Sequence, residues 1–214
     1  MLKNFLIFTL SLISLTSLIF NFRSYQQIAS QNLVVKVVDG DTFQLKSGKR
    51  VRLKGVDAPE YSRCGGKEAK ERLSQLISNK KVKLTEETQE AYGRSLALVY
   101  YQNILINKII LEEGWGRTDY QKNSQRNILT AAFHQAQQNK IGIWSSLCRE
   151  GPDQSVNDCL IKGNIDKSTY NKFYHLPNCK QYNQIIIEKD IGEGYFCSEE
   201  EAIKAGFKKA SGCP

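Results

Sequence analysis

Two short acidic turns lie close together along the chain and carry residue types suited to metal and phosphate chemistry. Asp39 and Asp41 lie in the first turn, VDGDT, and Asp57 and Glu60 lie in the second, DAPE. Arg52 stands between the turns on an expected strand. Carboxylates held close together repel one another unless a cation or a proton is present, and hard oxygen ligands suit calcium or magnesium. The arginine suits a phosphate group.

The elements that must position these residues are short strands and amphipathic helices. Strands are expected where strand-forming runs stand between turn residues, over 33–38, 42–45, 50–55, 81–85 and 95–101. Apolar residues at helical spacing predict helices over 67–78, 104–113 and 125–139. Five strands with interposed helices is the count of a small oligonucleotide-binding (OB) type barrel, which binds ligands on one strand face. We therefore expect an α+β, mainly β fold.

Length and charge agree with a nucleic-acid partner. The 214 residues leave room for one ordinary domain and a small second one. The formal net charge of +8 lets the surface attract a polyanion, while an acidic pocket holds a metal. No obligate protein partner is indicated.

Residues 1–30 are expected to be a signal peptide or an N-terminal membrane anchor. Lys3 precedes an uncharged, mainly apolar run over 5–20, whose length lies between a signal-peptide core and a membrane span. Cleavage and retention both remain open. In either case the rest of the chain is expected to be extracellular or at the cell surface.

The composition changes after residue 148. We expect one domain over 33–148, a linker over 149–157 and a small Cys-rich module over 158–214. The module has one expected helix over 198–205, with Ser198 as the N-cap and Glu201 completing a capping box. Its short length gives it little apolar core.

The six cysteines leave two interpretations of the module. An even count in an exported chain favours disulfides. Cys159–Cys197 with Cys179–Cys213 is one of three possible pairings, and Cys64 would then pair with Cys148. Alternatively, His175 with Cys179, Cys197 and Cys213 could form a zinc site.

Five motifs in order give the chain a resemblance to a known family. VDGDT (38–42), RLKGVDAPE (52–60), YGR (92–94), EEGWGR (112–117) and IGIW (141–144) resemble the staphylococcal nuclease (thermonuclease) family over about residues 33–148. The resemblance implies a five-stranded barrel with three helices. It also implies calcium-dependent hydrolysis of phosphodiester bonds in DNA and RNA, leaving 3′-phosphate ends.

The same resemblance assigns metal-binding roles by position. Asp41 and Asp57 resemble direct calcium ligands, and the backbone carbonyl of Ala58 resembles a third ligand. Asp39 would act through water in the outer coordination shell. Ala58 replaces the threonine that is usual in the family, so any contact made by that hydroxyl is lost.

The remaining site residues would act on water and substrate. Glu60 resembles the residue that orients or deprotonates the attacking water. Arg52 and Arg94 resemble the two guanidinium groups on the scissile phosphate. Tyr92 and Tyr120 match positions whose rings pack against the bound nucleotide, and stacking of this kind tolerates any base.

An alternative of a different class is a noncatalytic nucleic-acid-binding module anchored at the cell surface. Such a degenerate binder would be expected to lose Glu60 or one of the arginines, and this chain keeps them. The Cys-rich module resembles small modules appended to exported bacterial nucleases, and a surface protein in which that module is the active part is a third possibility.

Overall fold

The structure is a computed structural model of the 214-residue chain, and it describes residues 14, 16, 17, 20, 32–90, 93–119, 121–150 and 159–214. Most of the expected targeting segment over 1–30, Tyr92, Tyr120 and most of the expected linker lie outside the described residues. Within the described part, no helix is both long enough and apolar enough to span a membrane. The proposed domain boundaries stay a prediction.

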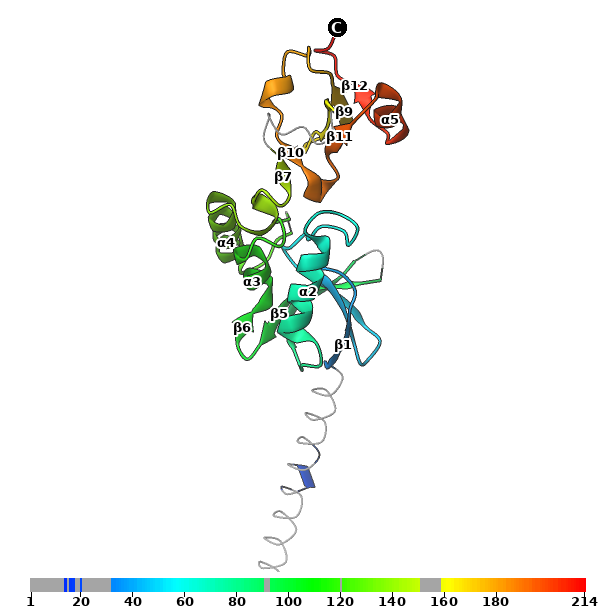
Figure 1. Cartoon of the computed structure of the whole chain (residues 1–214). Helices are drawn as coiled ribbons and strands as arrows, with labels where there is room; N and C mark the ends of the chain where they lie inside the picture. Colours follow the sequence, from blue (N-terminus) through cyan, green and yellow to red (C-terminus); the bar gives the residue numbers. More distant parts are fainter. Residues whose placement is uncertain are drawn as a thin grey trace, which may run out of the picture.

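A six-stranded sheet forms the centre of the region over 33–148 (Figure 1). Its strands are β1 (Val34–Val37), β2 (Thr42–Leu45), β3 (Arg50–Leu53), β4 (Lys83–Gln89), β5 (Ser95–Tyr101) and β6 (Ile104–Leu105). The order is β1-β2-β3-β5-β4, with β6 paired to β5. β3 and β5 run parallel, and the other neighbouring pairs are antiparallel.

The expected five-stranded barrel with three helices is not confirmed. β1 and β4 lie at the two ends of the sheet order, and only an isolated bridge between Leu33 and Lys81 joins their ends in the described region. The described residues also contain four α-helices. The fold is therefore a mixed α+β arrangement without a closed barrel.

The additional strand β6 replaces the first turn of an expected helix. Gln102 and Asn103 adopt φ angles of 49° and 65°, which allow a two-residue hairpin turn. Ile104 then pairs with Tyr101, so the helix begins only at Ile106. Strand β4 also continues beyond its expected end at residue 85. A register shift between Thr85 and Thr88 in its pairing with β5 accommodates the longer strand.

Three helices cover the sheet region: α2 (Gly66–Ile77), α3 (Ile106–Glu112) and α4 (Arg126–Gln138). Helix α2 buries Ala69, Leu73 and Ile77 because they recur every four residues on one face. Burial of each large apolar side chain contributes roughly 1.5–3 kcal/mol. This packing fixes the loop between β3 and α2, which carries the second acidic turn.

The C-terminal segment, residues 159–214, forms a separate four-stranded sheet. Its order is β11 (Gly194–Phe196), β8 (Ile161–Ile165), β9 (Lys172–His175) and β12 (Lys208–Lys209). Helix α5 (Glu199–Lys204) is capped by Ser198, whose side chain accepts a hydrogen bond from the Glu201 N–H, as expected. The small core contains Ile161, Tyr174, Ala202 and Phe207.

Three disulfides join the cysteines as Cys64–Cys148, Cys159–Cys197 and Cys179–Cys213. The disulfide interpretation is therefore supported over the zinc site. His175, Cys179 and Cys213 place three potential ligand atoms within 4.8 Å of one another, but both sulfurs belong to one disulfide.

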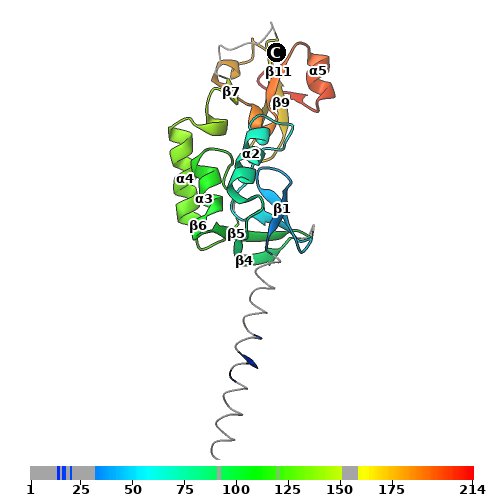
Figure 2. The ribbon, with the colours of Figure 1, turned by 60° about the horizontal axis from the view of Figure 1, so that its bottom comes forward.

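A short two-stranded sheet connects the C-terminal segment to the rest of the molecule. β7 (Arg149–Glu150) pairs antiparallel with β10 (Ile187–Glu188), so the first two residues of the expected linker form a strand. The short helices η1 (Gly142–Trp144), η2 (Tyr182–Gln184) and η3 (Lys189–Ile191) complete the described elements. Both views show the C-terminal segment beyond the end of α2 nearest β7 (Figures 1 and 2).

Candidate active site

The first acidic turn connects β1 to β2 and places Asp41 in the interior. Asp41 is only 2% exposed. Its Oδ1 accepts a hydrogen bond from the Thr42 hydroxyl at 2.8 Å, and its Oδ2 accepts one from the Ala58 N–H at 3.0 Å. Asp39 closes the turn by accepting from the Asp41 N–H at 3.1 Å. The two acidic turns therefore touch through Asp41 and Ala58.

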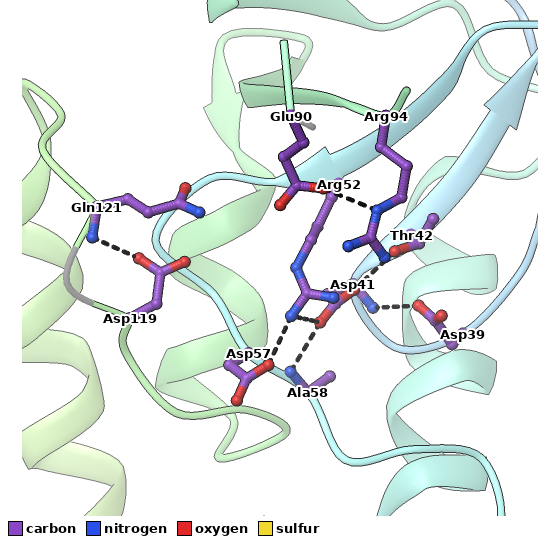
Figure 3. A network of polar contacts seen from close by, with 10 residues as sticks. All are labelled: Asp39, Asp41, Thr42, Arg52, Asp57, Ala58, Glu90, Arg94, Asp119 and Gln121. Atoms are coloured by element: carbon purple, nitrogen blue, oxygen red, sulfur yellow. Dashed lines mark hydrogen bonds and ion pairs between the residues drawn. The ribbon is translucent and has the colours of Figure 1, made fainter. Parts of the chain in front are cut away.

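Arg52 joins the carboxylates of the two turns. Its Nη2 lies 3.0 Å from Asp41 Oδ2 and 2.5 Å from Asp57 Oδ1. Figure 3 shows its guanidinium reaching from β3 between the two aspartates. This strand position follows from the pairing of β3 with β2, which sets Arg52 opposite Thr42. The sequence-based expectation that these residues converge agrees with the geometry.

Asp41 has the most perturbed electrostatics among the carboxylates at this site. Burial raises the pKa of Asp41 to about 7, while Arg52 opposes the shift and Asp39 adds to it. Three aspartates share this region with the Arg52 guanidinium. Carboxylate oxygens with excess negative charge suit a hard divalent cation, so the donor set fits calcium.

Arg94 is held beside this cluster by a short turn. Glu90 accepts a hydrogen bond from Arg94 Nε at 2.8 Å and also donates its N–H to the Arg94 carbonyl at 2.8 Å. Gly93 closes the turn with φ of 76°, a conformation that favours glycine. Figure 3 shows the Arg94 guanidinium directed to the side where the aspartates lie. Sequence reasoning found Arg94 but did not find Glu90, which orients it.

Glu60 lies at the far end of the second acidic turn and is exposed. A cavity of about 120 Å³ opens there, and its lining includes Asp57, Ala58 and Glu60. Arg63 and Arg117 supply positive charge, and Asp190 of the C-terminal segment completes the wall. Glu60 therefore shares with Asp57 a small cavity that water can enter.

Asp119 is a fourth aspartate near the site, and the sequence interpretation missed it. Burial raises its pKa, Arg52 lowers it and Asp57 raises it, so Asp119 lies within the electrostatic range of both residues. It accepts a hydrogen bond from the Gln121 N–H at 2.9 Å (Figure 3). Its position next to Tyr120 in the GRTDY stretch was the available signal.

Comparison with known proteins identifies the fold region. The family model described as staphylococcal nuclease homologue matches residues 50–146. An uncharacterized endonuclease of Haemophilus influenzae is 36% identical over 141 residues, which cover 64% of this chain and 79% of that protein. The residues matched by the family model include Arg52 and Arg94, and also the second acidic turn with Asp57 and Glu60.

Two named nucleases show the same similarity. Thermonuclease of Staphylococcus hyicus is 34% identical over 126 residues, covering 53% of this chain and 75% of that protein. Micrococcal nuclease of Shigella flexneri is 32% identical over 126 residues, covering 52% of this chain and 72% of that protein. The family model and these relatives show that the chain belongs to the staphylococcal nuclease family, whose domain is of the OB type.

Proposed function

We propose that this nuclease is an exported, calcium-dependent enzyme that hydrolyses phosphodiester bonds in both DNA and RNA. The observation that carries the proposal is the convergence of two acidic turns on one arginine, with Arg52 Nη2 at 3.0 Å from Asp41 and 2.5 Å from Asp57. Family membership makes the chain a nuclease hydrolase. The residue roles below are our assignment.

Asp41, Asp57 and the backbone carbonyl of Ala58 would hold calcium, and Asp39 would contribute through water. When bound, calcium supplies a Lewis acid that polarises the phosphodiester and neutralises charge. Ala58 can serve without its family's usual hydroxyl because only its backbone is required, and its N–H is already bonded to Asp41. Buried Asp41 supplies the more rigid of the two carboxylates.

Glu60 positions the attacking water or removes its proton. Its carboxylate is exposed and lines the cavity beside Asp57, so water can reach it. As water attacks phosphorus, the bond to the 5′ oxygen of the next nucleotide breaks on the opposite side, and that oxygen takes up a proton from solvent. The phosphate then stays on the 3′ oxygen, which accounts for the proposed 3′-phosphate ends.

Arg52 and Arg94 stabilise the charge that develops on the equatorial phosphate oxygens. A guanidinium donates several hydrogen bonds in a planar fork, so lysine would be a poorer substitute. Glu90 keeps Arg94 extended through the 2.8 Å bond to Nε, which leaves the terminal nitrogens for the phosphate. Arg52 contacts Asp41 and Asp57, the proposed metal ligands, so it would link them to the phosphate of the substrate.

Substrate choice is broad in this proposal. Tyr92 and Tyr120 would stack on bases without reading them, so DNA and RNA both fit. The net charge of +8 adds attraction to the polyanion. Export rests on the apolar N-terminal segment and on three disulfides, which persist in oxidising compartments.

The direct test of these roles is cleavage of plasmid DNA and of RNA by Glu60→Gln and Arg52→Ala in calcium. We expect kcat to fall by roughly 10²–10⁴-fold for Glu60→Gln and by roughly 10²–10³-fold for Arg52→Ala. The matched control is Glu71→Gln, because Glu71 is exposed on α2 and pairs only loosely with Lys67 at 3.9 Å. Rates equal to the control in both variants would refute the assignment.

A further inference from the structure

The backbone of Asp57 is held by the backbone of Arg117. Asp57 N–H donates to the Arg117 carbonyl at 2.8 Å, and Arg117 N–H donates back to the Asp57 carbonyl at 2.8 Å. The two residues form an isolated antiparallel bridge. The Asp57 side chain is 59% exposed and contacts Arg52 at 2.5 Å, so its place depends on that ion pair and on this backbone pair.

The Arg117 side chain reaches into the C-terminal segment. Its Nε and Nη2 lie 2.8 Å and 2.7 Å from Asp190 Oδ2, and Nη2 also lies 2.8 Å from Glu188 Oε2. The side chains of Asp190 and Glu188 are 1% and 7% exposed. The guanidinium also lies 4.5 Å from the ring centroid of Trp144. Asp190, Glu188 and Trp144 therefore hold the Arg117 guanidinium in place.

The same stretch contacts the loop beyond Glu60. A Cβ at Gly192 would lie 3.5 Å from Arg63 Nε, so Arg63 packs against the Gly192 backbone. The disulfide Cys64–Cys148 ties that loop to Cys148, whose carbonyl accepts the Lys189 N–H at 2.9 Å. Residues 188–192 thus brace both ends of the turn that carries Asp57 and Glu60.

Burying these charges is a costly way to join two parts of a protein. An apolar contact of similar size holds parts together equally well or better. Asp190 Oδ1 is buried with no hydrogen-bond partner in the described part of the chain, which adds to the cost. What charged groups supply, and apolar groups do not, is a fixed direction for the Arg117 guanidinium through two charge-assisted contacts.

We propose that Asp190 and Glu188 are positioning residues of the active site, which act on Asp57 through Arg117. They hold the Arg117 side chain, its backbone holds Asp57, and the turn from Asp57 to Glu60 keeps the geometry for metal and water. The C-terminal segment is in this view a structural part of the catalytic centre. The inference rests on the proposed function, because it assigns Asp57 and Glu60 the roles given above.

The test compares Asp190→Asn and Glu188→Gln with a control inside the same segment. Glu199→Gln removes a carboxylate of the same segment that accepts a 2.6 Å hydrogen bond from the Tyr174 hydroxyl and not from Arg117. Calcium alone is titrated into each full-length protein by calorimetry, without nucleic acid. We expect the calcium Kd to weaken about 10-fold in Asp190→Asn and Glu188→Gln, as for other residues that orient a metal ligand. Glu199→Gln should leave it unchanged.

Two further measurements separate positioning from general loss of structure. Amide hydrogen exchange at Asp57 and Arg117 should accelerate in Asp190→Asn and stay unchanged in Glu199→Gln. In DNA cleavage at saturating calcium, Asp190→Asn should lower kcat while KM stays within twofold of the wild type. Should Asp190→Asn fail to fold, Glu188→Gln carries the same test, since it leaves the Asp190 contacts in place.

The outcomes distinguish the two proposals. A wild-type protein that cleaves DNA equally well in chelator would overturn the proposed function. A wild-type protein that needs calcium, together with unchanged calcium Kd and unchanged amide exchange in both variants, would overturn only the positioning role. Equal weakening in Glu199→Gln would also overturn it, because the effect would then be a general one.

Discussion

Single residues fix the site through contacts that reach across the sequence. Asn107 is the clearest case outside the acidic turns: it is fully buried on α3, and its side chain bonds two backbone groups of β5 and one in the loop after β3. Its Oδ1 accepts from the Val99 N–H at 2.8 Å, and its Nδ2 donates to the Lys54 carbonyl at 2.8 Å. Lys54 follows β3, so Asn107 helps to hold the strand that carries Arg52.

Asn107→Ala should therefore destabilise the fold strongly. It removes the side-chain partner of the Val99 N–H and of the Lys54 carbonyl, and each such unpaired group costs about 1–3 kcal/mol. We expect the free energy of unfolding, measured in urea, to fall by about 3 kcal/mol. Asn139→Ala is the control, because Asn139 is exposed at the end of α4. A loss no larger than the control's would show that these bonds contribute little.

At the scale of elements, glycine at one position sets the distance between the first acidic turn and α2. A Cβ added at Gly40 would lie 2.5 Å from the Cβ of Ala69 and 2.7 Å from that of Ala58. Both neighbours are short side chains that cannot move aside. The turn carrying Asp41 can approach the turn carrying Asp57 only because no side chain stands between them.

Gly40→Ala should therefore separate the two acidic turns. We expect a loss of about 1–3 kcal/mol in unfolding free energy from overpacking, accompanied by weaker calcium binding in calorimetry. Gly194→Ala is the matched control, since a Cβ there meets nothing within 4 Å. Calcium affinity equal to that of the control would contradict the close approach of the turns as a requirement of the site.

The sequence predicted regular elements well and long-range polar contacts poorly. β2 and β5 match the expected bounds, and α4 differs by one residue at each end, because their apolar patterns are strong. The β6 hairpin was missed because Gln102-Asn103 is not among the commonest turn pairs. Arg117 and Asp190 are 73 residues apart, and no local pattern relates them. Motif resemblance supplied most of the candidate site residues, and Glu90 and Asp119 carried no motif of their own.

At the scale of the whole molecule, a disulfide within the nuclease region and ion pairs to the C-terminal segment lie close together. The Cys64–Cys148 disulfide closes a loop with a sequence separation of 84 residues. Cross-linking a loop of this length restricts the unfolded chain considerably. Glu188 adds ion pairs with Arg117 and Arg149 at 2.8 Å each. Both kinds of link meet beside the second acidic turn.

Removing this disulfide should lower stability more than a surface substitution does. For Cys64→Ala with Cys148→Ala, we expect the free energy of unfolding to fall by about 4 kcal/mol under non-reducing conditions. The single Cys64→Ala variant should lose a similar amount, because it also lacks the bond. Denaturation midpoints in urea that match the wild type would show that the cross-link does not stabilise the molecule.

The pH dependence of the C-terminal segment should follow His175. Burial lowers the pKa of His175 below the ordinary 6.5, and Lys162 lowers it further. The unfolded chain therefore binds the proton more readily, so stability should be lost as pH falls from the unfolded pKa of 6.5 toward the lower folded pKa. The chain has two histidines, so NMR can follow each ring separately. A folded-state pKa above 6.5 for His175 would contradict its buried, neutral state.

The most direct measurement of the central claim is DNA cleavage by the full-length protein as calcium is removed and restored. Two acidic turns that share Arg52 are proposed to form one calcium-dependent centre for phosphodiester hydrolysis. The account predicts that excess chelator abolishes cleavage and that added calcium restores it, with products ending in 3′-phosphate. Cleavage at the full rate in chelator would contradict it.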